Sequence, residues 1–515
     1  MAAAKSPATA GQCTRCAAPL SRYNSEATCA ACRRADEAIP ASGEWLSRSA
    51  DVPADDTGAV LRAWRASTGH SQAGAAGLLG MTQQNLSQIE NGRQVMSYEL
   101  RQRAVSVLGI SAEDLGLSPG RPRAELDSAV AIDQARWRQE RRWLNQHRSE
   151  LARLAVQLYP AEHQVPHTPL IAGSGWIPDE PTELRSLRLS LDEQPHAVAI
   201  DGSEAETLPT RPLCAPGQWF DRYTSAIRHL DPPRLFESRP SYCLLGGQLG
   251  ADGLHFGLSA YFDKLDVSET LGHELAIACL RERNSIPDAI EPLRAELPFR
   301  TLIGDPFDPV RRAIIPAVTT LTIRLRRYPA EPSFLLHWRD PAKVATAGGV
   351  YDVIPAGEFQ PASVALWDRH NDFDLWRNVV REYSEELLGT PEHDGTRSKP
   401  IDYQAWPLYR DLEDAQAAGT LVPFVLGLGL DALTLAATIL TVVVIDDDVF
   451  TRAFGAATRY NEEGEIVAIG DGRATEGVPF TRESVQRLLS SEPMASPGAA
   501  CLALAWRHRE RILSL

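Results

Sequence analysis

The sequence predicts a multidomain protein: an all-α N-terminal domain, an α+β C-terminal domain and a small zinc-ribbon-like knuckle at the N-terminus. Its 515 residues are too many for one hydrophobic core. Helical periodicity dominates residues 57–160, whereas helix and strand patterns mix from about residue 234 without a regular βαβ order. Four cysteines in two close pairs precede both regions. We therefore expect a knuckle, a helical domain, a connector helix, an irregular linker and an α+β domain over 1–40, 55–118, 122–160, 161–232 and 233–515.

Charge is distributed unevenly along the chain. The formal net charge is −15 at pH 7, but residues 1–160 carry a net charge of +3 and the remainder carries −18. The acidity therefore belongs to the C-terminal part. It does not argue against contact between the N-terminal part and DNA.

One apolar segment, residues 420–445, is long enough to span a bilayer. It contains Asp431 at its middle and Pro423 near its start, and it ends in the β-branched run "TVVVI". A central carboxylate is costly in hydrocarbon, so we expect two buried strands and no membrane contact. No secretory signal opens the sequence, and we expect a cytoplasmic, reducing location.

The first cysteines form the pattern C-x2-C-x12-C-x2-C, made by Cys13, Cys16, Cys29 and Cys32. Each pair suits a tight turn that directs two thiolates at one ion, and four thiolates favour tetrahedral zinc. The segment is too short for a hydrophobic core, so the metal would supply most of its folding free energy. The alternative is a disordered tail with reduced thiols.

Residues 57–117 predict a compact group of short helices. Ser71 and Thr82 are each placed to cap a helix, and "LGM" predicts the turn between the two helices. In the second of these helices Leu86 and Ile89 face inward. The outward positions carry polar, uncharged side chains that suit base edges: Gln83, Gln84, Ser87 and Gln88.

The segment "SQAGAAGLLGMTQQNLSQIENG" resembles the two-helix core of the phage repressor and Cro type of helix-turn-helix, the family of xenobiotic-response-element regulators. The resemblance implies that Thr82–Glu90 is a recognition helix in the major groove of double-stranded DNA, with Gln83 and Gln84 at base edges. It further implies phosphate contacts from Gln72, Asn91 and Arg93, with Gln72 also bracing the first recognition glutamine. A homodimer on a two-fold site is expected. The alternative is a helical bundle whose glutamines face water.

Residues 124–160 contain no glycine or proline before Pro160 and predict one long amphipathic helix. Its apolar stripe includes Trp137, Leu144 and Leu151. The helix either packs against the next domain or acts as a dimerisation or signalling lever, and periodicity does not separate these roles.

In the C-terminal part, "NDFDLWRNVVREYSEELLG" predicts a capped helix that ends in a cluster of carboxylates. Residues 381–389, "REYSEELLG", resemble the helical end of the Nudix box, at positions Arg381, Glu382, Glu385 and Glu386. The resemblance implies a Nudix-like α+β sandwich that binds Mg²⁺ and a nucleotide-type ligand, with hydrolysis of a nucleoside diphosphate derivative where the box is complete.

The first half of that box departs from the family pattern. Phe373 stands where the pattern has glutamate, and Gly389 comes one residue late. Glu358, in "PAGEF", is the candidate for a displaced first half. A degraded box is typical of a domain that binds a ligand without turning it over, and the remaining alternative is a solvated acidic face.

Together with this capped helix, the segments "LFESRPSY", "GDPFD", "FLLHWRDPA" and "VIPAGEFQP" resemble the Nudix-like domain that follows a helix-turn-helix in actinobacterial regulators. They are also similar to the Nudix-like domains found beside nucleotide second-messenger synthases in bacterial defence loci. The leading hypothesis is therefore a DNA-binding transcriptional regulator whose C-terminal domain senses a nucleotide-type small molecule. Two alternatives stay open: a Mg²⁺-dependent Nudix-type pyrophosphohydrolase with a DNA-binding tether, and a protein-interaction domain in a defence or developmental complex.

The cysteine pattern generates a test on the full chain. If the four thiolates hold zinc, the purified protein contains about one zinc per chain by metal analysis. Replacing Cys13 and Cys16 together by serine should remove that zinc, whereas replacing Cys214 should leave it in place. Stoichiometric zinc in the double variant would contradict the assignment.

Overall fold

The computed structural model describes two compact units that divide between Ile132 and Asp133. The described residues are 57–94, 96–112, 114–115, 117, 128–194, 196–233, 236–250, 253–283, 285–327, 330–339, 349–390, 399–455, 464–467 and 477–514. The predicted zinc ligands Cys13, Cys16, Cys29 and Cys32 lie outside them. We call the parts before and after the division the N-terminal and the C-terminal unit.

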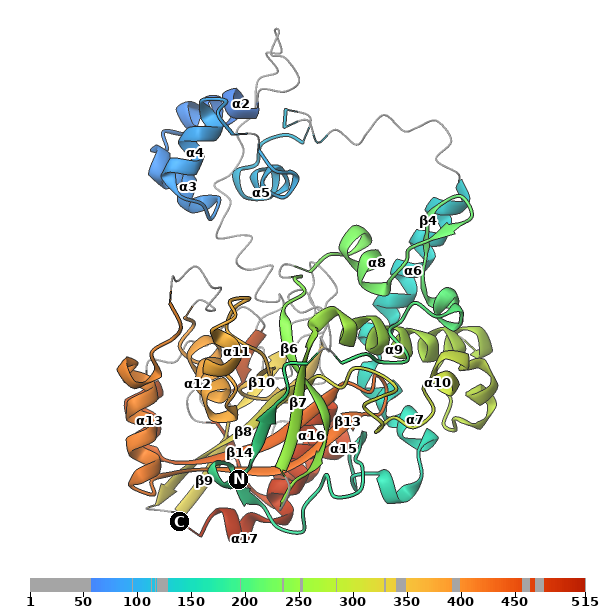
Figure 1. The fold of residues 1–515 in the computed structure, drawn as a ribbon, viewed down its shortest axis with the longest axis vertical. Helices are drawn as coiled ribbons and strands as arrows, with labels where there is room; N and C mark the ends of the chain where they lie inside the picture. Colours follow the sequence, from blue (N-terminus) through green and yellow to red (C-terminus); the bar gives the residue numbers. More distant parts are fainter. Residues whose placement is uncertain are drawn as a thin grey trace, which may run out of the picture. The chain divides into compact units, whose positions relative to one another are not determined.

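The N-terminal unit is all-helical, as its sequence predicts (Figure 1). It contains α2 (Thr57–Thr68), α3 (Gln72–Leu78), α4 (Gln83–Glu90) and α5 (Tyr98–Leu108). Both predicted caps are confirmed, because the Ser71 hydroxyl accepts from the Gly74 amide at 3.1 Å and the Thr82 hydroxyl accepts from the Asn85 amide at 3.2 Å. The four helices enclose one apolar core: Leu61, Trp64, Ala75, Ala76, Leu79, Leu86, Ile89, Met96, Ala104, Leu108, Ile110 and Leu115.

Two glycines fix the geometry around α4. Gly80, in the turn between α3 and α4, has a φ of +65°, a backbone conformation that other residues rarely adopt. Gly58 lies in α2 where this helix meets the end of α4, and a Cβ there would be 2.2 Å from the Ile89 carbonyl oxygen. Only glycine permits that close approach of α2 to α4.

The C-terminal unit is built on a mixed eight-stranded sheet. Along the sheet the main order is β1 (Leu170–Ile171), β13 (Leu421–Asp431), β14 (Ala437–Asp446), β8 (Pro316–Arg327), β9 (Ala330–Phe334) and β16 (Val478–Pro479). Two further strands, β2 (Thr182–Glu183) and β12 (Ala356–Glu358), pair with β13 and β8 respectively. Strands β14 and β8 are parallel, and the other pairs are antiparallel.

The apolar segment 420–445 forms β13 and β14, which confirms the expectation of two buried strands. Every residue of β14 except Asp446 is buried. Asp431 ends β13, and its carboxylate accepts hydrogen bonds from the Thr434 hydroxyl at 2.6 Å and the Ser496 hydroxyl at 2.6 Å. None of the helices in the described ranges is long and apolar enough to cross a membrane.

Three smaller sheets complete the strands of this unit. Their orders are β3–β7–β6, β11–β10–β15 and β4–β5. The bounds are β3 (Leu189–Leu191), β4 (Leu213–Ala215), β5 (Gln218–Trp219), β6 (Pro240–Gln248), β7 (Gly253–Ala260), β10 (Leu336–Arg339), β11 (Val350–Val353) and β15 (Gly464–Val467).

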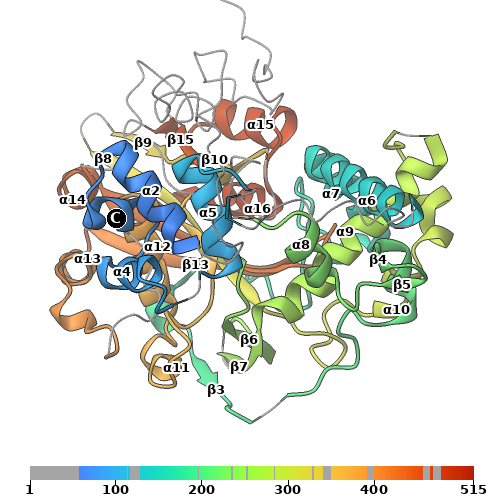
Figure 2. The same ribbon diagram turned by 90° about the horizontal axis from the view of Figure 1, so that it is seen from above.

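Helices cover the large sheet and extend beyond it. Helix α16 (Ser496–Arg507) packs against β8, β11, β13 and β14, and α12 (Leu375–Glu386) packs against β8 and β12. Figures 1 and 2 both show α6 to α10 gathered at one side of this unit. The helix bounds there are α6 (Ser128–Gln146), α7 (Arg148–Ala155), α8 (Tyr223–Leu230), α9 (Tyr261–Arg283) and α10 (Pro298–Ile303). The other helices are α11 (Asp368–Asn371), α13 (Pro407–Ala417), α14 (Asp447–Phe454), α15 (Arg482–Ser491) and α17 (Arg509–Ile512).

The connector differs from the single helix that its periodicity predicts. It is interrupted at His147, between α6 and α7. The His147 ring stacks on Trp143 with centroids 4.4 Å apart, and its Nδ1 bonds the Trp143 carbonyl oxygen at 2.8 Å. The His147 amide also donates to that oxygen at 3.1 Å, and the Leu151 amide donates to the His147 carbonyl oxygen at 2.9 Å, so the interruption is short and hydrogen bonding continues across it.

The connector packs against α9 through a buried cluster of charges. Glu269 of α9 accepts from Arg141 at 2.9 Å and from Arg148 at 2.7 Å. Burial alone would raise the pKa of Glu269, but the two guanidinium groups outweigh it and hold this pKa below its usual value. The packing role of the connector is therefore observed, while the lever role stays a prediction.

The structure also differs from the expectation of an irregular linker over 161–232. Residues of this segment form β1 and β2, which pair with β13 of the large sheet. Leu170, Ile171 and Leu184 are buried in the same core. The apolar residues that bury this segment are few and follow neither helical nor strand periodicity. The sequence pattern therefore does not predict that the segment joins the core.

Candidate functional site

Helix α4 presents a polar surface at its N-terminal turn. Thr82, Gln83 and Gln84 are exposed, whereas Ser87 and Gln88 are half-buried. Asn85, which the sequence reasoning did not select, is exposed beside the glutamines. The side chains best placed to reach outward are thus those of the first turn.

The other end of α4 is anchored by Glu90, whose side chain is only 2% exposed. Its carboxylate accepts from Arg65 Nε at 2.9 Å, from Arg65 Nη2 at 3.1 Å and from Gln72 Nε2 at 2.8 Å. Burial raises the pKa of Glu90, but these hydrogen bonds outweigh it and lower the pKa overall. One carboxylate therefore holds α2, α3 and α4 together.

Gln72 has a different contact from the one that the resemblance implies. Its amide bonds Glu90, at the C-terminal end of α4, rather than Gln83 at the N-terminal end. The reason is the buried carboxylate, which needs a donor on each side, and α3 supplies one of them. A phosphate contact by Gln72 stays a prediction.

Asn91 and Arg93 follow α4 and are both exposed. The Asn91 side chain donates to the Ser87 carbonyl oxygen at 2.7 Å, and the Arg93 amide donates to the Gln88 carbonyl oxygen at 2.8 Å. Gly92 between them has a φ of +67°. These bonds hold the loop after α4 close to the helix, with the Arg93 guanidinium in solvent.

The order of helices, the glycine turn and the exposed first turn of α4 agree with a comparison to known families. Residues 56–116 match a family model described as a helix-turn-helix domain. Residues 56–116 are a helix-turn-helix domain. The match does not extend into the C-terminal unit, and no curated protein matches the chain. A helix-turn-helix domain indicates DNA binding and a role in transcriptional regulation.

Outside the helix-turn-helix domain, the acidic stretch lies at the end of α12. Arg381 is buried and donates to the Gln360 carbonyl oxygen at 2.7 Å and to Asn378 Oδ1 at 3.0 Å. Its guanidinium also lies 4.0 Å from Asp372 Oδ2. The hydrogen bonds of Arg381 are therefore made to Gln360 and Asn378, while its charge also interacts with Asp372, Glu382 and Glu385.

Strand β12 packs against this acidic stretch, so the structure brings Glu358 near α12 as the resemblance implies. Glu386 accepts from the Ala356 amide at 2.8 Å, and a Cβ on Gly357 would lie 2.0 Å from the Glu382 carboxyl carbon. Glu358 itself forms an ion pair with Lys264 of α9. The described residues include no group of three or more His, Cys, Asp or Glu side chains placed to hold a metal ion.

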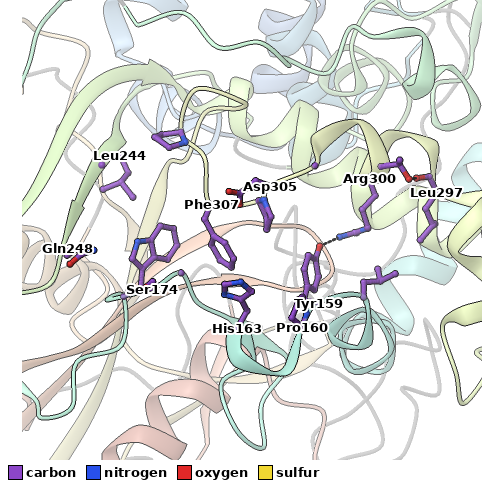
Figure 3. A pocket seen from close by; sticks show the side chains of 18 of the residues that line it. Tyr159, Pro160, His163, Ser174, Leu244, Gln248, Leu297, Arg300, Asp305 and Phe307 are labelled. Atoms are coloured by element: carbon purple, nitrogen blue, oxygen red, sulfur yellow. Dashed lines mark hydrogen bonds between the residues drawn. The ribbon is translucent and has the colours of Figure 1, made fainter.

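The sequence reasoning missed a cavity in the C-terminal unit that has a volume of about 800 Å³ (Figure 3). Its lining comes from several separate segments, including residues 158–163, 173–176, 244–248, 294–301 and 304–309. Two sequence segments noted for other reasons, "GDPFD" and "GGQLG", contribute to this lining, and neither predicts a cavity. In the second, Gly247 is required by the β6–β7 hairpin, because a Cβ there would lie 2.2 Å from the Gly253 carbonyl oxygen.

The anchoring role of Glu90 generates a test. Arg65→Met removes the cation that pairs with a buried carboxylate and should lower the free energy of unfolding by about 3 kcal/mol. This is the low end of the range for breaking a buried ion pair, because about a quarter of the Arg65 side chain is exposed. Amide hydrogen exchange of α4 in the full chain should accelerate about 100-fold.

The matched control is Arg93→Met, which removes an exposed arginine after the same helix and should leave exchange within a factor of about two. Equal exchange rates in the two variants would show that the ion pair does not anchor α4.

Proposed function

We propose that the protein is a sequence-specific transcriptional regulator that reads double-stranded DNA with α4. The observation that carries the proposal is the pair of exposed glutamines, Gln83 and Gln84, at the first turn of a helix whose other end is fixed by Glu90. A glutamine amide can bond adenine N6 and N7 together, and such a pair discriminates between bases by about 1–3 kcal/mol.

The surroundings of α4 support the same proposal. The Arg93 guanidinium and the Asn91 side chain are exposed just after the helix, where they can contact phosphates. One helix-turn-helix domain covers a short site, so we propose that the protein binds as a homodimer on a two-fold operator.

We further propose that the C-terminal unit is the effector-binding part and takes a nucleotide-type small molecule. The support is a cavity of small-molecule size in a unit that also holds the connector through Glu269. A ligand can change DNA binding only if it binds one arrangement of the DNA-binding domains more tightly than another.

Hydrolysis at the acidic stretch is the less favoured proposal. Mg²⁺ would need several carboxylates turned to one point. Here Glu358 is neutralised by Lys264, Glu386 bonds a backbone amide of β12, and Arg381 is engaged with Gln360. A binding role for this unit needs none of those side chains to be rearranged.

The glutamines on α4 provide the test. A duplex selected by the full chain from a random-sequence library should bind Gln83→Ala or Gln84→Ala about 10–100-fold more weakly in fluorescence anisotropy, since each variant loses its base contacts. Binding to an unrelated duplex should change little, because phosphate contacts remain.

The matched control is Gln102→Ala, which removes an exposed glutamine from α5 of the same domain. Its affinity for the selected duplex should stay within a factor of two of wild type. If both α4 variants keep wild-type affinity and specificity, α4 is not the reading helix.

A further inference from the structure

The cavity of about 800 Å³ has the size of a small-molecule site and lies apart from the acidic stretch. Arg381, Glu382, Glu385, Glu386 and Glu358 are not among its lining residues. The fold builds it between β6, the turns that follow α7, and α10 with the loop after it.

Aromatic rings form one wall of the cavity. The Phe307 ring lies 4.9 Å from the His163 ring and 5.3 Å from the Trp176 ring, the latter in an edge-on arrangement. His163 is held in place because its Nδ1 bonds the Ala172 carbonyl oxygen at 3.0 Å. The three rings are not coplanar, so a planar ring can stack on the face of one of them and meet another at its edge.

Figure 3 shows that Tyr159 lies between His163 and Arg300, and that its hydroxyl bonds the guanidinium of Arg300. This bond, from Nη1, is 2.6 Å long. The arginine side chain is only 8% exposed, and its other acceptors are the backbone carbonyl oxygens of Ala432, Leu271 and Leu433. Its Nε is buried without a partner among the described residues.

The buried charge of Arg300 is not matched by a full negative charge nearby. Within the described ranges, no carboxylate forms a salt bridge with it. Glu274 interacts with Arg300 electrostatically, since the arginine charge partly offsets the rise that burial causes in the pKa of Glu274, and its carboxylate accepts from the Phe299 and Arg300 amides at 2.6 and 3.1 Å. Burial raises the pKa of Glu274 to about 7, so at neutral pH this group is partly protonated.

Two other charged residues line the cavity. Arg294 is about half exposed and only loosely paired, with its Nε 3.4 Å from Glu291 Oε1. Asp305 is already used by the backbone, because its Oδ1 accepts from the Phe307 amide at 2.9 Å. Among the residues that line the cavity, Arg294 and Arg300 are cations and Asp305 is an acid, so the lining carries a net positive charge, part of which Glu291 and Glu274 offset from outside the lining.

We propose that this cavity binds a planar aromatic or heteroaromatic anion no larger than a mononucleotide. The ring lies against the wall of Phe307, His163 and Trp176, and the anionic group lies toward Arg300 and Arg294. Burial of the ring and compensation of the unmatched arginine charge both favour binding. The proposal assigns the effector site to this cavity and names the chemistry of its ligand. Anion binding itself does not depend on the proposed effector role; only an effect of the anion on DNA binding does.

Binding is tested with the full chain by isothermal titration calorimetry. The probes are AMP and indole-3-acetate, each compared with an uncharged counterpart, adenosine and indole. At least one anion should bind with a Kd below about 1 mM and at least about tenfold more tightly than its counterpart. AMP alone would indicate a phosphate-bearing ligand, and indole-3-acetate alone would indicate a carboxylate. No binding of either anion up to about 5 mM would overturn the proposal.

Three variants locate the site. Phe307→Ala removes the ring and Arg294→Gln removes a cation, and each should weaken the anion that binds by at least about tenfold. The control is Arg281→Gln, an exposed arginine of α9 that is loosely paired with Glu296 at 3.8 Å and does not line the cavity. Its affinity should equal that of wild type.

If Phe307→Ala does not fold, Phe307→Leu keeps the apolar volume and still removes the stacking surface. Wild-type affinity in both the Phe307 and the Arg294 variants would place the ligand elsewhere and overturn the proposal. Because the titration contains no DNA, it tests the cavity separately from the regulator proposal. Intact anion binding without DNA binding contradicts only the regulator proposal, and intact DNA binding without anion binding contradicts only the cavity proposal.

Discussion

The arrangement of the helices around α4 depends on one buried carboxylate. Glu90 lies at the last position of α4, and its side chain accepts from Arg65 of α2 and Gln72 of α3. A buried carboxylate costs several kcal/mol unless it is paired and hydrogen-bonded, so arrangements of the three helices that break these contacts are strongly disfavoured. The contacts of Glu90 thereby set the orientation of α4, and with it the position of the exposed glutamines at its opposite end.

The C-terminal unit uses the same physical device. Glu269 is buried between Arg141 of α6 and Arg148 of α7, so the connector is attached to α9 on both sides of its interruption at His147. Glu274, one turn further along α9, accepts from the first amides of α10. Helix α9 therefore links the connector to Arg300, which lines the cavity. Under the proposed effector role, this chain of contacts would join the proposed anion site to the connector.

Local signals account for most of what the sequence predicted correctly. The caps at Ser71 and Thr82 depend on residues three positions apart, and the strands β13 and β14 follow from long apolar runs. The Gln72–Glu90 contact and the cavity wall could not be found in this way. They join side chains 18 or more residues apart, and nothing in the local pattern of Phe307 or His163 indicates that the two rings meet.

The acidic stretch shows the limit of reading chemistry from a motif. The spacing of Glu382, Glu385 and Glu386 predicts carboxylates on one side of a helix, and α12 with its cap at Asp374 is present. What the carboxylates do depends on β12, which reaches them from another part of the chain through the Ala356 amide and whose Glu358 is paired with Lys264 of α9. The Nudix resemblance therefore stays a prediction, whereas the helix-turn-helix domain is supported by a family match.

The most direct test of DNA reading by α4 replaces single atoms of the DNA. Each adenine of the selected duplex is changed in turn to 7-deazaadenine, which lacks the N7 acceptor, and affinity is measured with wild type and the two α4 glutamine variants. If a glutamine of α4 bonds adenine N7, affinity should fall about tenfold when one or two particular adenines are substituted. Once that glutamine is replaced by alanine, the same substitutions in the DNA should no longer lower the affinity. Wild-type affinity at every substituted adenine, or losses that persist in both variants, would contradict the account.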